Sequence, residues 1–221
     1  MRLGVKPLTF LVRLLVFFGL TYVLWIPVAP GYTYVLASLT RGFLHVTESL
    51  ADAHGQVTEM EVRQTKENRP AIFFAHRLYP QVVQSGIPAE WVQANLVLLI
   101  PLMLAVPARS WVQRFGRLGA ALGIALALQV LDIAVTVKAM YASFEPLGYG
   151  AVSSWLYQFA DAFTQSMDTQ LFPFAIWAGI HFKQLMGWDL APATPAQPVP
   201  SSRVEQQSRK KKAAKRAASR G

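Results

Sequence analysis

The sequence predicts an all-α membrane protein with four transmembrane helices, an amphipathic helix and a small β-hairpin on the side away from the cytoplasm. Three observations predict this fold class. Four apolar segments have the length of a helix that crosses or nearly crosses a membrane. The clusters of basic residues all fall on one side of these segments. In one connecting loop, apolar and polar residues alternate as they do in a β-strand. The 221-residue chain is 53% hydrophobic, which suits one membrane domain with a polar tail.

The predicted spans are residues 8–28, 90–107, 118–140 and 170–186. About 20 residues of helix cross a hydrocarbon core of roughly 30 Å, so the fourth segment is the shortest for this role. Trp25 suits a membrane interface at the end of the first span, and Pro101 is expected to kink the second. A signal peptide is the alternative for the first segment, but the apolar run is too long and no small-residue cleavage site follows it.

The segments between the spans carry two kinds of periodicity. After Pro30, apolar residues recur every three or four positions, which predicts an amphipathic helix on the membrane surface or across the bundle. Residues 56–64 then alternate, residues 71–78 are rich in strand formers, and TKENRP lies between them, which predicts a β-hairpin over residues 56–78. The loop 141–169 is again amphipathic.

The composition divides the chain into two parts. Residues 1–190 are predicted to form the membrane domain, and residues 191–221 a disordered basic tail, because Ala, Pro, Gln, Ser, Lys and Arg cannot bury a core there. This tail carries most of the net charge of +9. It contains no aromatic residues that would stack on bases, so we expect no specific nucleic acid as a partner.

The basic residues of short loops predict the orientation. They occur at the N-terminus, between the second and third spans and in the tail, which places both termini in the cytoplasm and the hairpin outside. The residues predicted to lie at the anionic inner leaflet, or to act only as topological anchors, are Arg109, Arg114, Arg117, Lys210, Lys211, Lys212, Lys215 and Arg216.

Four polar residues are predicted to form a buried cluster between the second and third spans. A carboxylate at the centre of a span costs about 2.5–3.5 kcal/mol, so Asp132 needs an explanation. One hypothesis is that the cluster binds a ligand or moves a proton. The other is that it supplies hydrogen bonds between helices, with Asp132 paired to Lys138 or Arg41. The members are Asn95, Gln129, Asp132 and Thr136.

The sequence contains no recognisable catalytic machinery. There is no cysteine, and the Ser-hydrolase, Walker, dinucleotide and zinc-protease motifs are absent, so we expect neither an enzyme nor a cofactor. His45, Glu48 and Asp52 share a helical face near His54, which makes a metal site the alternative to an ordinary polar face; we predict no metal.

The order of segments resembles the exosortase H-associated membrane proteins of Gram-negative bacteria. The resemblance covers residues 8–186 and follows LWIPVAP, QVTEMEVRQTKENRPAIFFAHRL, IPAEWVQANLVLLIPLML and QVLDIAVTVK in that order. It implies a multi-pass accessory protein of the bacterial inner membrane, with a periplasmic hairpin, in a system that processes C-terminal sorting signals. The family offers no catalytic residues to carry over, and the chain lacks the cysteine nucleophile of an exosortase.

We therefore expect a non-enzymatic accessory or scaffold whose outward loops contact an exosortase or its sorted substrate. The residues predicted for this partner surface are Glu59, Glu61, Arg63, Phe73, Phe74 and Trp155. Two alternatives remain: a transporter or ion-conducting subunit that uses the cluster around Asp132, and a membrane-embedded enzyme that uses His45, His54 or Asp132.

Overall fold

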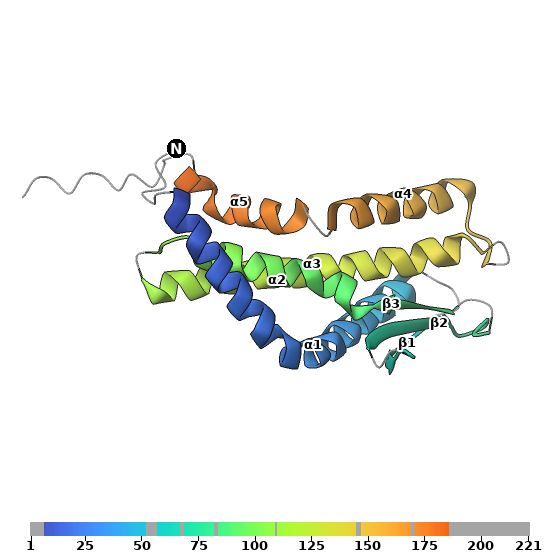
Figure 1. Cartoon of the computed structure of the whole chain (residues 1–221). Helices are drawn as coiled ribbons and strands as arrows, with labels where there is room; N and C mark the ends of the chain where they lie inside the picture. The colour runs from blue at the N-terminus through green and yellow to red at the C-terminus, as the bar shows by residue number, and fades with distance from the viewer. Residues whose placement is uncertain are drawn as a thin grey trace, which may run out of the picture. The chain divides into compact units, whose positions relative to one another are not determined.

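The computed structural model describes residues 7–51, 57–66, 69–81, 84–108, 110–144, 147–168 and 171–185. Figure 1 shows these residues as five helices and a three-stranded antiparallel sheet. In chain order the elements are α1 (Pro7–Ala51), β1 (Thr58–Gln64), β2 (Pro70–His76), β3 (Gln84–Pro88), α2 (Ala89–Ala105), α3 (Trp111–Ala142), α4 (Ala151–Asp168) and α5 (Leu171–Leu185). The prediction of a mostly helical chain is confirmed.

Helix α1 joins the predicted first span and the predicted amphipathic helix in one element. It continues through Pro27 and Pro30, each of which removes a backbone hydrogen bond, and it bends between an N-terminal arm (residues 8–28) and a C-terminal arm (residues 31–51) (Figure 1). The two arms differ in burial. The most apolar stretch of α1 is only 6% buried, whereas the C-terminal arm buries Leu36, Leu44 and Glu48.

The sheet has the order β1-β2-β3, with both pairs antiparallel. Strands β1 and β2 confirm the predicted hairpin. Because side chains alternate between the two faces of a strand, Met60, Ile72 and Phe74 lie on one face and are buried. This inner face packs on the C-terminal arm of α1 and on the last part of α3, where Tyr141 is fully buried. Strand β3 was not predicted.

Helices α1 and α3 are the two described helices that are long and apolar enough to cross a membrane. Helix α2 and residues 171–182 of α5 are apolar but shorter. Ser110 caps α3 by accepting a hydrogen bond from the Gln113 amide at 3.2 Å, so the helix begins before the predicted third span.

A second core cluster joins α2, α3 and α5. It consists of Leu96, Leu99, Met103, Ala121, Ala125 and Ile176. The alanines of α3 allow close approach of neighbouring helices. Helix α3 also packs along α4, which occupies most of the predicted amphipathic loop.

Candidate functional site

The outer face of the sheet carries most of the predicted partner residues. Glu59, Glu61 and Arg63 alternate on β1, and the register sets Glu61 directly opposite Phe73 of β2. Glu61 and Arg63 form an ion pair, and the Arg63 guanidinium lies 5.7 Å from the centroid of the Phe73 ring. These contacts hold an aromatic ring between charged groups on an exposed surface.

Gly86 of β3 fixes the position of the Phe73 ring. The two residues are directly opposite each other in the sheet, and a Cβ atom at position 86 would lie 2.9 Å from Cε1 of Phe73. A larger residue would have to displace the ring, so the close approach requires glycine here. The sequence placed Gly86 in a loop and gave no sign of this contact.

Two open pockets adjoin on this side of the molecule and share Arg41 and Glu59. One has a volume of about 480 Å³ and follows β1 and β2, and the other has about 550 Å³ and lies between α1 and the start of β1. We call them together the outer groove. Its polar and aromatic lining residues are Ser38, Arg41, His45, Thr58, Glu59, Glu61, Arg63, Phe73, Phe74, Arg77 and Gln84.

The outer groove combines charges of both signs. Arg63 is paired with Glu61, whereas Arg41 and Arg77 make no ion pair within the part of the chain that the structure describes. Exposed guanidinium groups bind carboxylates through paired hydrogen bonds. The groove is therefore suited to a polar segment with acidic groups.

Sequence reasoning missed Arg41, Arg77 and Gln84 as groove residues. Ser38, Arg41 and His45 share one face of a helix at spacings of three and four, and this was the available signal. Nothing local indicated that this face would lie beside β1.

The two remaining predicted partner residues are not in the exposed part of this surface. Phe74 is only 2% exposed and packs against Tyr141, with ring centroids 6.5 Å apart, because it points to the opposite face from Phe73. Phe74 therefore offers little surface to a partner, although it lines the pocket along β1 and β2. Trp155 is 64% exposed, but it lies on α4 and stacks on Phe159 at 5.4 Å.

Glu48 connects three elements below the sheet. Its Oε2 accepts hydrogen bonds from the backbone amides of Val57 at 3.0 Å and Thr58 at 3.1 Å. Its Oε1 accepts from the Thr58 hydroxyl and from Nζ of Lys138 in α3, the latter at 2.9 Å. Glu48 lies in the C-terminal arm of α1, beyond the predicted first span. Burial raises the pKa of its carboxyl, but the hydrogen bonds and charge of Lys138 and the bonds from Thr58 and Val57 lower the pKa below 4.5.

The arrangement around Glu48 bears on two hypotheses. Lys138, one of the two partners considered for Asp132, forms an ion pair with Glu48. The metal hypothesis combined Glu48 with His45, Asp52 and His54, of which Asp52 and His54 lie outside the described residues. His45 is exposed while Glu48 is buried, and within the described ranges no three His, Asp or Glu residues come together as a metal site.

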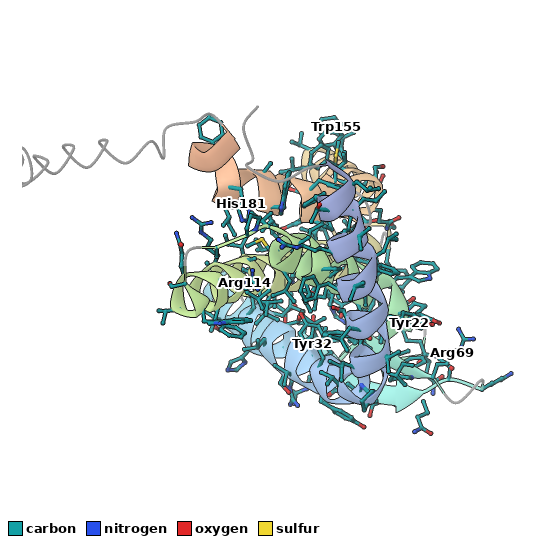
Figure 2. The ribbon with its side chains drawn as sticks, turned by 60° about the vertical axis from the view of Figure 1, so that its left-hand side comes forward. Tyr22, Tyr32, Arg69, Arg114, Trp155 and His181 are labelled. Carbon is teal, nitrogen blue, oxygen red and sulfur yellow. The ribbon has the colours of Figure 1, made fainter. Side chains whose placement is uncertain are left out.

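The members of the predicted buried cluster contact different neighbours: Gln129 bonds to α1 and α2, whereas Thr136 bonds to α4. Asn95 and Gln129 face each other across a cavity of about 10 Å³ that α5 also lines. Gln129 is 2% exposed and links three helices, because it accepts from the Tyr32 hydroxyl of α1 and donates to the Val92 carbonyl of α2 at 2.6 Å. Figure 2 labels Tyr32 among the packed helices and Tyr22 on the outer side of α1.

A neighbouring network stabilises the bend of α1. Nε2 of Gln93 donates to the Ala29 carbonyl at 3.0 Å and to the Thr33 hydroxyl at 2.7 Å, and its Oε1 accepts from Trp25 at 3.2 Å. A proline bend leaves backbone groups of the helix without their usual hydrogen bonds. In apolar surroundings such a bend is tolerated when side chains of a neighbouring helix bond to these groups. Gln93 was not predicted as part of the cluster.

Asp132 and Thr136 face α4. The Thr136 hydroxyl donates to Oδ1 of Asp161 at 2.6 Å, and Gln165 donates to Oδ2 at 2.9 Å. Asp132 interacts with Thr164 beside Asp161, and its Oδ1 is buried without a hydrogen-bond partner among the described residues. Asp161, which the sequence did not single out, thus adds a second carboxylate on the α4 side of this interface.

The basic residues predicted for the inner leaflet are only partly described. Arg114 lies 5.0 Å from the ring centroid of Trp111 at the start of α3, and Arg117 follows one turn later. Arg109 and the lysines and arginine of the tail lie outside the described residues.

Comparison with protein families, with characterised proteins and with solved structures found no match to the chain.

Proposed function

We propose that this chain is a non-enzymatic accessory protein of the bacterial inner membrane, of the exosortase-associated kind, which holds a partner polypeptide in the outer groove. The observation that carries the proposal is the groove itself, where Arg41 and Arg77 stand exposed beside an aromatic ring on a small sheet. The partner is an exosortase or its sorted substrate, as the resemblance of the sequence implies. Its contact segment contains acidic groups that match the two arginines.

The proposed topology has four membrane passages and both termini in the cytoplasm. The N-terminal arm of α1 supports it, because large apolar side chains such as Leu15, Val16 and Val23 are more than 60% exposed there and have no other apolar surroundings. Arg114 and Arg117 at the start of α3 support the orientation. Helix α2 supplies the second passage, and α5 takes part in the fourth.

Photocrosslinking in native membranes tests the partner. A photoreactive residue at Phe73 is expected to crosslink one dominant envelope protein, identified by mass spectrometry as a membrane peptidase or a protein with a C-terminal sorting signal. The exposed Gln64 at the far end of β1 is a control outside the groove. Arg41→Glu is expected to abolish the Phe73 crosslink and leave the protein level unchanged, because Arg41 is exposed.

The assignment of the groove fails if Phe73 and Gln64 give the same products, or if Arg41→Glu leaves the crosslink intact. Identification of the partner as unrelated to protein sorting would remove the exosortase part of the proposal and keep the docking surface.

A second candidate function is ion or proton translocation. The observation that favours it is Asp132 of α3, whose buried Oδ1 no described group satisfies, with a second carboxylate, Asp161, on the facing helix α4. Two carboxylates in apolar surroundings resist double ionisation, so such a pair holds a proton or a cation.

Flux measurements decide between the two functions. Under the second candidate, the purified chain in liposomes conducts protons under an imposed potential, and Asp132→Asn abolishes the flux at an unchanged protein level. Ser166→Ala serves as a control that removes an exposed hydroxyl of α4, which bonds to the Ala162 carbonyl of the same helix, and keeps both carboxylates. Absence of flux in the natural chain, or loss of the protein itself in Asp132→Asn, would leave the pair a packing feature.

A further inference from the structure

Helix α4 is amphipathic, but its polar face is turned toward the protein and its apolar face outward. This is the opposite of a helix on the surface of a water-soluble protein. Its polar side chains face α3: the Ser154 hydroxyl donates to the Ala142 carbonyl at 3.0 Å, and Asp161 accepts from Thr136 at 2.6 Å. Tyr157 contacts Tyr149 on the same side, with ring centroids 6.1 Å apart. The polar face of α4 is thus used inside the protein.

The opposite face of α4 is apolar and exposed. Its large side chains are 49–80% exposed and recur at spacings of three and four; they are Val152, Trp155, Leu156, Phe159 and Phe163. Trp155 stacks on Phe159 at 5.4 Å and Phe159 on Phe163 at 6.3 Å, which makes a row of rings along the helix. Trp155 is labelled in Figure 2.

The surroundings of this face have to be apolar. Exposed apolar surface costs about 25 cal/mol per Å² in water, and a contiguous patch of this kind marks contact with a membrane or another protein. From Ala151 to Phe182 the chain has no lysine or arginine and only two acidic residues, Asp161 and Asp168. Asp161 is turned toward α3, away from the row of rings.

The packing of α4 on α3 indicates that lipid, and not another protein, covers the apolar face of α4. Helix α4 runs antiparallel to α3, with Ser154 beside Ala142 and Asp161 beside Thr136. Helix α3 has 32 residues and a length of about 48 Å, which exceeds a hydrocarbon core of roughly 30 Å and reaches through the headgroup region. The α4 rings therefore lie from the interface inward, and tryptophan is the residue that membrane interfaces favour.

We propose that the outward face of α4 contacts the outer leaflet of the lipid bilayer, with Trp155 at the interface and Phe163 deeper. Helix α4 then completes the fourth passage together with α5, whose 15 residues span only about 22 Å. This inference rests on the proposed membrane location, and it removes Trp155 from the partner surface.

Site-directed spin labelling of the full chain in liposomes tests the inference, because the natural chain has no cysteine to remove. Single cysteines at Phe159 and Leu156 report the outward face. Val16→Cys in the N-terminal arm is the membrane reference, and Glu61→Cys on the sheet is the water reference. Each nitroxide is relaxed by oxygen, which concentrates in lipid, and by a water-soluble nickel chelate.

We expect the ratio of oxygen to nickel accessibility at Phe159 and Leu156 to match that at Val16 and to exceed that at Glu61 several-fold. A ratio like that of Glu61 would overturn the inference, because α4 would face water. Low accessibility to both reagents would overturn it as well, because another protein or a second copy would cover the face. A water-like ratio at Val16 would instead refute the membrane location of the N-terminal arm, on which the proposed function depends.

Discussion

Replacement of Glu48 by glutamine is expected to destabilise the folded chain by about 3–5 kcal/mol, the usual cost of removing one partner from a buried ion pair. The Glu48 side chain is 1% exposed and that of Lys138 is 13% exposed, so the lysine would lose its ion pair with Glu48 while its charge stays largely buried. Both carboxylate oxygens accept from donors, and the NH₂ group of glutamine would face one of those donors.

Unfolding of the purified chain in detergent, followed by tryptophan fluorescence, measures this loss. Glu90→Gln is the matched control, because Glu90 is also paired with a basic residue, Arg69, but its side chain is 52% exposed. The control is expected to cost below about 1 kcal/mol. The double variant Glu48→Leu with Lys138→Met removes both charges and is expected to recover most of the stability. Equal effects of Glu48→Gln and Glu90→Gln would refute the role of this pair.

The second large effect is expected for Gln129→Leu. The substitution leaves the Tyr32 hydroxyl without its acceptor in the interior of three helices, and it removes a second bond to the Val92 carbonyl, which keeps its bond within α2. An orphaned polar group costs about 1–3 kcal/mol, and no water is at hand in a membrane to replace the lost bonds.

The same unfolding measurement checks this prediction. Gln158→Leu is the matched control, because Gln158 is exposed on α4 and its amide lies 3.5 Å from the Ser143 hydroxyl, the distance limit of a hydrogen bond. The control is expected to change stability little. Adding Tyr32→Phe to Gln129→Leu removes the orphaned hydroxyl and is expected to recover part of the loss. A double variant that is no more stable than Gln129→Leu would mean that the Tyr32 hydroxyl bond contributes nothing.

The parts of the fold that the sequence predicted are those with a clear local period. The hairpin was predictable because residues 58–64 alternate, and helix α3 because a long apolar run has no breaker. Strand β3 was not predictable, because QSGIP is short, has no alternation and contains glycine and proline. The unbroken α1 was also missed, because two prolines predict an end and only the hydrogen bonds of Gln93 from another helix explain the continuation.

The candidate site shows the same limit. Alternation places Phe73 and Phe74 on opposite faces, so the sequence could have excluded one of them but not have said which. Lys138 follows Asp132 by six residues, which puts the two side chains about 120° apart around α3, so their predicted pairing was already unfavourable. The position of Arg41 beside Glu59 depends on how α1 packs under the sheet, and no local pattern carries that information.

The continuity of α1 has a mechanical consequence. One helix carries Arg41 of the outer groove, Glu48 below the sheet and, in the proposed topology, the first passage to the cytoplasm. No flexible linker separates these parts of α1. A force on a partner bound in the outer groove is therefore transmitted along α1 and displaces its N-terminal arm. The bend at Pro27 and Pro30 is the one compliant joint along α1, and it sets how far such a force tilts the arm.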